Sequence, residues 1–465
     1  MNENVHQFPL ALSVACSLLA EKILGVQPGS GWQRLEQPVE ALTSRDNLDH
    51  LAWLSAGEGV RVFWASRDGA LVSAGQGVAL SIKCGYSLPS HQAVRESESL
   101  MQDIFEHCPD ARFYGGLAFS SQPDSHWPGF AGGDIVLPRF ELVRESGRVK
   151  LACHLQLPSG EAGEALRAEL AEQARRLSTM PAEFPKALPR GALGSHKPSL
   201  EEWRHQLDVA LAALETDELD KVVLSREQKV SLDGELCPWS MLVSWQKQTP
   251  ETYRFAYWSE QGDCFFGASP ECLYQRHNRT LESEALAGTA PRGQTPIQDR
   301  QLAVTLLADD KNLRENSLVM RAITDALGDC SETVEPIDTT SLIKLRSVQH
   351  LRQKVRAYLK PRISDADLLE RLHPTPAVGG TPKQAAESLI HQLEPHRRGW
   401  YAGPFGTIGR ESAELSVAIR SALLQGQTLT LYSGVGLVPG SVADSEWAEL
   451  DSKLRTVLSL LDISL

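Results

Sequence analysis

The segment Glu414-Leu-Ser-Val-Ala-Ile-Arg-Ser-Ala-Leu-Leu-Gln-Gly-Gln-Thr-Leu-Thr-Leu-Tyr432 carries the clearest strand signal of the chain. Apolar residues alternate with small or polar ones on both sides of Gln425-Gly426, which is typical of a β-hairpin. A second hairpin is predicted over residues 265–287, around His277-Asn278. Long antiparallel strands combined with long helices indicate an α+β fold.

Working outward from these hairpins, helical periodicity predicts helices over residues 297–327 and 443–461. Ser199 and Glu202 form an S-x-x-E capping box, which predicts that another helix begins there. The N-terminal part shows strand-like runs at 60–65, 134–143 and 149–157 and a helical run at 163–177.

The chain divides into three parts by its sequence pattern. Residues 1–180 form the N-terminal portion, 181–199 a proline-rich crossover or linker, and 200–465 the portion that carries most candidate site residues. From its composition alone, the proline-rich segment is the best linker candidate.

Composition excludes several functional classes. The chain has 465 residues, 42% of them hydrophobic, and a net charge of -13, whereas a nucleic-acid partner would require a basic footprint. The eight cysteines form no CxxC pair, which indicates free thiols in a reducing compartment. The apolar run at 8–20 has no preceding Lys or Arg and is shorter than a membrane span, so an amphipathic helix and a cytoplasmic protein are predicted.

The last predicted helix carries an unusual charged face. Glu446, Glu449 and Lys453 lie at positions i, i+3 and i+7, so they share one face. A solvated helix surface would explain them equally well. However, the segment Tyr432-Ser-Gly-Val-Gly-Leu-Val-Pro-Gly440 is predicted to contain a strand end and a glycine-rich loop directly before the helix, and such loops suit anions. Its spacing does not match a dinucleotide-binding fingerprint.

Other polar residues are ambiguous when taken singly. Arg420 is predicted on a hairpin strand among small residues, where it can grip a carboxylate or point to solvent. Exposed turns or strand ends would account for each of the remaining candidates, namely Lys221, Glu271, Glu315 and His373.

Taken together and in order, these residues resemble the motifs of the chorismate-utilising enzymes. The matching blocks are Lys221-Val-Val-Leu-Ser-Arg226, Gly267-Ala-Ser-Pro-Glu271, Glu284-Ala-Leu-Ala-Gly-Thr289, Lys311 to Asn316, His373 to Gly380, Ile419-Arg420, Ser433-Gly-Val-Gly436 and Glu446-Trp-Ala-Glu449. Tyr114-Gly-Gly-Leu-Ala-Phe119 and Leu137-Pro-Arg139 resemble the same family less strongly. The resemblance implies an anthranilate-synthase-like fold, with large antiparallel sheets in a four-layer α/β/β/α core. In such a fold the segment 181–199 would be a surface crossover, and the two portions would form one integrated domain.

Two positions indicate the branch of the family. The aminating members carry Gln where this chain has Lys221, and aminodeoxychorismate synthases carry a nucleophilic Lys where it has Ala287. The closest resemblance is to menaquinone-specific isochorismate synthases, through Val348-Gln-His-Leu-Arg352, Trp400-Tyr-Ala-Gly403 and Leu219-Asp-Lys-Val-Val-Leu224. It implies a Mg2+-dependent, reversible conversion of chorismate to isochorismate, with no glutamine amidotransferase subunit and no membrane partner.

The resemblance also implies roles. Lys221 would be the general base that activates water for attack at ring C2, and Glu271 the general acid that protonates the departing C4 hydroxyl. Glu315 and Glu449 would bind Mg2+, while Glu446 and Asn312 would contact metal-bound water. The residues expected to bind substrate are Ala287, Gly288, Thr289, His373, Arg420, Gly434, Gly436 and Lys453.

Three alternatives stay open at this stage. A salicylate synthase would continue by eliminating pyruvate, and a siderophore-pathway isochorismate synthase would differ only in its physiological role. A non-catalytic chorismate-binding subunit would bind substrate without turnover.

Overall fold

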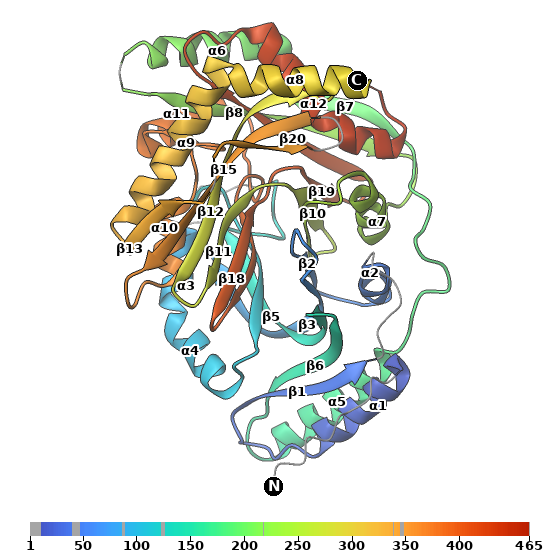
Figure 1. Ribbon diagram of the computed structural model, residues 1–465. Helices are drawn as coiled ribbons and strands as arrows, with labels where there is room; N and C mark the ends of the chain where they lie inside the picture. Colours follow the sequence, from blue (N-terminus) through green and yellow to red (C-terminus); the bar gives the residue numbers. More distant parts are fainter. Residues whose placement is uncertain are drawn as a thin grey trace.

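The computed structural model describes residues 11–39, 47–85, 89–121, 126–216, 218–337, 339–344 and 348–464. Antiparallel pairings link twenty strands of this part of the chain into one hydrogen-bonded network. The network divides at strand β5 (Gly133–Glu145), which pairs with β3 (Leu71–Cys84) and with β4 (Arg112–Leu117). Two sheet arms extend from this division (Figure 1).

The first arm runs from β3 to the strands that carry Lys221 and the glycine-rich segment. In pairing order after β3, its strands are β2 (Arg61–Ala65), β9 (Tyr253–Trp258), β10 (Cys264–Ser269), β19 (Ser421–Gln425), β20 (Thr428–Leu437), β8 (Lys221–Leu232) and β7 (Gly191–Lys197). The short strand β16 (Gly380–Thr381) pairs with the start of β8. The proline-rich segment thus contributes a strand, β7, to the sheet edge.

The second arm runs from β4 through the remaining C-terminal strands. In pairing order these are β17 (Pro404–Gly409), β18 (Ser412–Val417), β11 (Cys272–His277), β12 (Thr280–Pro291) and β15 (Val348–Leu359), with β13 (Ser331–Pro336) and β14 (Ser341–Lys344) both on β15. On its other edge β5 pairs with β6 (Arg148–Gln156), which pairs with β1 (Trp32–Val39).

The arms pack face to face through aromatic side chains. Phe255 of the first arm stacks on Phe405 of the second, with ring centroids 4.6 Å apart. Trp64 stacks on the same ring at 6.4 Å, and the Trp400 ring lies 6.2 Å from it. All four side chains are buried, so this core joins the two sheets.

Helices cover the outer faces of both arms. Helices α2 (Leu48–Ser55), α7 (Pro238–Gln248) and α12 (Ala443–Leu458) contact the first arm. Helices α8 (Pro296–Ala308) and α9 (Asp310–Gly328) contact β12 and β15 of the second. The expected α/β/β/α arrangement is therefore confirmed.

The remaining helices lie at the periphery (Figure 1). They are α1 (Leu12–Leu24) and α5 (Glu161–Arg176) beside β1 and β6, α3 (Ser90–Glu96), α4 (Glu98–His107), α6 (Leu200–Leu214), α10 (Asp365–Leu372), α11 (Lys383–Leu393) and the 3-10 helix η1 (Ser459–Leu461). No helix in the described part of the chain is long and apolar enough to span a membrane. Within the apolar run at 8–20, residues 8–10 lie outside the described residues.

Both predicted hairpin turns are confirmed. Gln425 pairs with Thr428 across the turn that contains Gly426, and His277 pairs with Thr280 across the turn that contains Asn278. The capping box is confirmed too, since Ser199 Oγ accepts from the Glu202 amide and Glu202 accepts from the Ser199 amide.

The predicted first strand of each hairpin is wrong, because each is divided between the two arms. The chain passes from β10 to β11 at residues 270–271, and from β18 to β19 at residues 418–420, where Arg420 has φ +50°. We call these two segments the crossings. Each crossing is hydrogen-bonded to a strand next to the other crossing. The Val417 amide of β18 donates to the Glu271 carbonyl, and the Ala268 amide of β10 donates to the Arg420 carbonyl.

The predicted helix over 297–327 is two helices. Asp309 between them has an extended backbone, with φ -83° and ψ 112°. Its side chain accepts from the Asn312 amide at 2.8 Å and so caps α9. A capping carboxylate satisfies the first free amides of a helix, which makes a break at Asp309 favourable despite the continuous periodicity.

Candidate functional site

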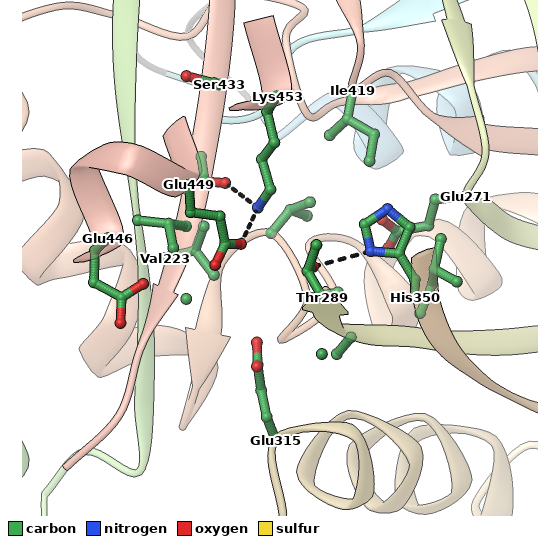
Figure 2. A pocket seen from close by; sticks show the side chains of 18 of the residues that line it. Val223, Glu271, Thr289, Glu315, His350, Ile419, Ser433, Glu446, Glu449 and Lys453 are labelled. Atoms are coloured by element: carbon green, nitrogen blue, oxygen red, sulfur yellow. Dashed lines mark hydrogen bonds and ion pairs between the residues drawn. The ribbon is translucent and has the colours of Figure 1, made fainter. Parts of the chain in front are cut away.

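A cavity lies between the arms, bounded by β12, β15, β20, α9 and α12 (Figure 2). Its empty space, part of it open to solvent, measures about 880 Å³. Twelve of the predicted site residues line it: Glu271, Ala287, Gly288, Thr289, Asn312, Glu315, Arg420, Gly434, Gly436, Glu446, Glu449 and Lys453. Motifs separated by more than 180 positions in the chain thus meet at one place.

Lys221 is not among the lining residues, but it contacts Glu315, which is one of them. It is the first residue of β8, is fully buried, and its Nζ donates to Glu315 Oε1 at 2.9 Å. A β-carbon on Gly436 would lie 2.7 Å from Lys221 Cε and 2.8 Å from Glu315 Oε1. Glycine at position 436 therefore leaves the space that the ion pair occupies.

The strand predicted to end within 432–440 extends further than expected, so Gly434 and Gly436 lie in a strand and not in a loop. β20 continues to Leu437, and its residues Gly434 and Gly436 pair with Ser225 and Val223 of β8. The absence of side chains lets neighbouring groups approach the strand, and Lys453 Nζ donates to the Gly434 carbonyl at 2.7 Å.

Glu271 lies at the first crossing, with only 3% of its surface exposed. Burial, followed by the charge of Glu284, raises its pKa to about 8 against the opposing effect of Lys221. Its nearest side-chain donor is Thr375, at 3.5 Å from Oε1. The carboxyl is therefore mainly protonated at neutral pH and has a proton to donate.

Two further carboxylates lie on α12, across the cavity from Glu271 in Figure 2. Glu449 Oε1 lies 2.8 Å from Lys453 Nζ, and Glu446 Oε1 lies 3.1 Å from Lys311 Nζ. Burial opposes ionisation of Glu449, but the charge and hydrogen bond of Lys453, together with the charges of Lys311 and Arg420, lower its pKa. Burial raises the pKa of Glu446, against the opposing charge of Lys311.

Arg420 lies at the second crossing and borders the cavity. Among the described residues it has no carboxylate partner within 4 Å, and its Nη1 donates to the Lys453 carbonyl at 2.8 Å. Burial lowers its pKa to about 10, so the guanidinium is still a cation at neutral pH. It is available to an anionic ligand.

A bulge in β12 shapes the floor of the cavity. The register with β15 shifts between Leu286 and Thr289, and Gly288 in the bulge has φ +84°. Asn312 Oδ1 accepts from the Thr289 amide at 3.2 Å, while its Nδ2 donates to Asp309 at 2.8 Å. Asn312 therefore fastens α9 to the bulge, with its side-chain oxygen and nitrogen both engaged by protein groups.

His373 is not among the residues that line the cavity. Its Nε2 lies 3.2 Å from the Phe119 carbonyl, and its ring packs edge-on against Phe119. His350 borders the cavity instead, with Nδ1 2.9 Å from Thr289 Oγ1. Burial, followed by the charges of Arg420 and Lys453, lowers the pKa of His350, so this imidazole is neutral.

Several lining residues with polar or charged side chains were not among the predicted site residues. Lys311, His350 and Tyr401 each belong to a block of the sequence that resembles the family, which is the signal that could have identified them.

Comparisons with known proteins agree on one family. A sequence model described as "Chorismate binding enzyme" matches residues 30–462. The chain is 34% identical over 352 residues to isochorismate synthase MenF of Bacillus subtilis, covering 75% of this chain and 74% of the relative. It is 31% identical over 424 residues to isochorismate synthase MenF of Escherichia coli, covering 90% and 92%.

Solved structures extend the agreement to the fold. The structure of MenF, the menaquinone-specific isochorismate synthase from Escherichia coli, matches with a TM-score of 0.83 and 29% identity, over 97% of this chain and 99% of that one. Anthranilate synthase component I from Streptococcus pneumoniae shares the fold, with a TM-score of 0.66 at 18% identity, over 98% of this chain and 95% of that one.

Proposed function

Because the chain belongs to the family of chorismate-binding enzymes, we propose that it is an isochorismate synthase that serves menaquinone biosynthesis. The observation that carries the proposal is that one cavity has two suitable groups beside it. The buried Glu271 has a pKa raised to about 8, and Lys221 contacts the lining residue Glu315. An acid and a base are the two groups that exchange of one hydroxyl for another requires. The names and similarity of the relatives support the choice of reaction and of pathway.

In the proposed reaction, water attacks ring C2 of chorismate while its proton passes to Lys221. The ring double bonds shift, the bond between C4 and its hydroxyl breaks, and Glu271 protonates the departing oxygen. One water enters and one leaves, so the overall reaction is an isomerisation. Proton exchange with solvent restores Glu271 and Lys221 for the next turnover.

Arg420 and Lys453 are proposed to hold the substrate carboxylates. Both are cations at the cavity wall, and Arg420 lacks a carboxylate partner within the described residues. A guanidinium grips a carboxylate through two parallel hydrogen bonds, which fixes orientation as well as charge. These two cations offer an anionic substrate direct contacts despite the net charge of -13.

We propose that Mg2+ is held by Glu315 and Glu449, with Glu446 near its water ligands. All three carboxylates line the cavity, yet no cluster of three or more His, Cys, Asp or Glu within the described residues could hold an ion by itself. Such a sparse set suits Mg2+, which commonly takes one or two protein carboxylates plus waters and an anionic ligand. Bound Mg2+ would neutralise charge on the substrate ring carboxylate.

Water as nucleophile is favoured over ammonia. Lys221 stands where the aminating members of the family carry Gln, and Ala287 lines the cavity where aminodeoxychorismate synthases carry a nucleophilic Lys. We therefore propose that the chain works without a glutamine amidotransferase.

Product analysis tests the proposal. Purified protein is incubated with chorismate, with and without Mg2+, and the products are identified by chromatography against standards. Isochorismate formed only with metal is the expected result. Salicylate and pyruvate would instead indicate a salicylate synthase, and unchanged chorismate with folded protein would indicate a binding subunit; either result would overturn the proposed activity.

A further inference from the structure

Arg67 belongs to the turn between β2 and β3, in the N-terminal part of the chain, but it contacts residues of the second arm. Its Nη1 donates to Glu284 Oε2 at 3.0 Å, and its Nη2 donates to Glu284 Oε1. Nη2 also donates to the Pro270 carbonyl at 2.5 Å. The side chains of Arg67 and Glu284 are 17% and 4% exposed, so this two-point ion pair is largely shielded from water.

Glu284 has a second partner on the same crossing. Its Oε1 accepts from the Cys272 amide at 3.0 Å. The ion pair therefore holds the carbonyl of the residue before Glu271 and the amide of the residue after it. The Tyr253 ring lies 4.9 Å below the Arg67 guanidinium and limits its movement.

We propose that Arg67 and Glu284 act as a positioning pair, which holds the Glu271 carboxyl in place and keeps it protonated for its role as general acid. The inference rests on the proposed function, since it assigns a purpose to Glu271. It also gives the N-terminal portion, which supplies none of the predicted site residues, a role in positioning the proposed general acid.

The electrostatic part of the proposal follows from the charges around Glu271. After burial, the negative charge of Glu284 is the largest influence that raises the pKa of Glu271. The groups that oppose it are Lys221 from β8, Lys453 from α12 and the hydroxyl of Thr375 from the segment between α10 and β16. The Tyr401 hydroxyl also faces this region, but it is neutral because burial raises its pKa. The charge of Glu284 thus acts on the pKa of Glu271 in the direction opposite to the charges of the two lysines.

The first test is the pH profile of Glu284→Gln. Removing the negative charge should move the alkaline limb of kcat/KM down by about one pH unit, from about 8 to about 7. The protonated fraction of Glu271 at pH 8 then falls from about one half to about one tenth, a roughly fivefold loss, while at pH 6 the loss is below about 1.2-fold. A merely structural defect would lower the rate equally at both pH values, which would overturn the electrostatic role.

Glu282→Gln is the matched control. It makes the same chemical change two residues earlier on β12, at a side chain that is 35% exposed and paired with Arg356 at the surface. Its pH profile should coincide with that of the parent protein. A shift equal to that of Glu284→Gln would overturn the proposal, because the effect would then not depend on contact with the crossing.

A second variant tests the positioning role and does not rely on Glu284→Gln folding. Arg67→Lys keeps the charge but loses the two-point grip and the contact with Pro270. We expect kcat to fall about tenfold at every pH, with KM for chorismate changed less than twofold and the alkaline limb still near pH 8. Unchanged kcat would overturn the positioning role.

An infrared measurement separates failure of this inference from failure of the proposed function. Difference spectra between pH 6 and pH 10, with the spectrum of Glu271→Gln subtracted, isolate the protonated-carboxyl band of Glu271 without any turnover. The band should titrate near pH 8 in the parent protein and about one unit lower in Glu284→Gln. If the band behaves so and no isochorismate forms, the proposed function fails alone. If isochorismate forms and the band titrates identically in both proteins, this inference fails alone.

Discussion

The two sides of the cavity place glutamate side chains in different surroundings. On the α9 and α12 side, three glutamates each lie within 3.1 Å of a lysine: Glu315 with Lys221, Glu446 with Lys311 and Glu449 with Lys453. On the opposite side, Glu271 lies in a buried crossing with no ammonium within ion-pair distance among the described residues and with Glu284 close by. One side pairs each carboxylate with an ammonium group and the other isolates a carboxyl, so the proposed metal-binding and acid roles would use the same residue type in different surroundings.

The largest expected effect comes from removing the reacting groups. Glu271→Gln and Lys221→Ala should each lower kcat by about 10²–10⁴-fold, the usual contribution of a positioned acid or base. Steady-state kinetics on protein whose fold is verified by circular dichroism measures this. If both variants kept near-normal rates, the acid and base assignments would be wrong.

Substitutions on the α9 and α12 side should instead change the dependence of activity on Mg2+. Glu449→Ala should raise the Mg2+ concentration for half-maximal activity by about 100-fold, and Glu446→Ala by about tenfold, because Glu446 is proposed to act through water. Titration calorimetry with Mg2+ gives an activity-independent check. An unchanged titration in Glu449→Ala would remove that residue from the ligand set.

A smaller effect should follow from filling the space at Gly436. In Gly436→Ala the new methyl group would lie 2.7 Å from Lys221 Cε and must displace the Lys221–Glu315 pair. We expect kcat to fall about tenfold and stability by about 1–3 kcal/mol, as for overpacked cores. Gly328→Ala, where a β-carbon would have no neighbour within 4 Å, is the control. Equal rates in the two variants would contradict a steric role for Gly436.

The smallest effect concerns stability. The pKa of Glu271 is raised from 4.5 to about 8 in the folded protein, so this group's contribution to stability falls as pH rises from about 4.5 to about 8. Glu271→Gln should therefore increase Tm by about 1–3 °C at pH 8, with the gain shrinking toward pH 5. Thermal unfolding at both pH values measures it, and a gain independent of pH would argue against a retained proton.

Much of the fold could be predicted from local pattern, because turns and caps are local. The turns at Gly426 and Asn278 and the capping box of Ser199 all stand where the sequence places them. The break at Asp309 was missed, since the apolar periodicity continues across it and only the capping hydrogen bond reveals it.

The site was predictable as a set of residues but not as an arrangement. Ordered motifs identified Glu271, Glu315, Arg420 and Glu449, which all border the cavity. Strand alternation at Arg420, however, predicted one continuous strand, whereas the chain changes sheets there. Which sheet a strand joins depends on pairings between distant segments, and no local pattern encodes them. For the same reason, no local pattern shows that His373 lies beside Phe119 or that His350 lies beside Thr289.

The crossings give the aromatic core a mechanical role. Because Glu271 and Arg420 lie on the two segments where the chain steps between sheets, any sliding of one sheet over the other is transmitted to them as a displacement. The stack of Phe255 on Phe405 opposes such sliding, and close-packed interiors transmit strain rather than absorb it. The precision with which the proposed proton donor would meet a substrate would therefore depend partly on apolar rings that line no part of the cavity.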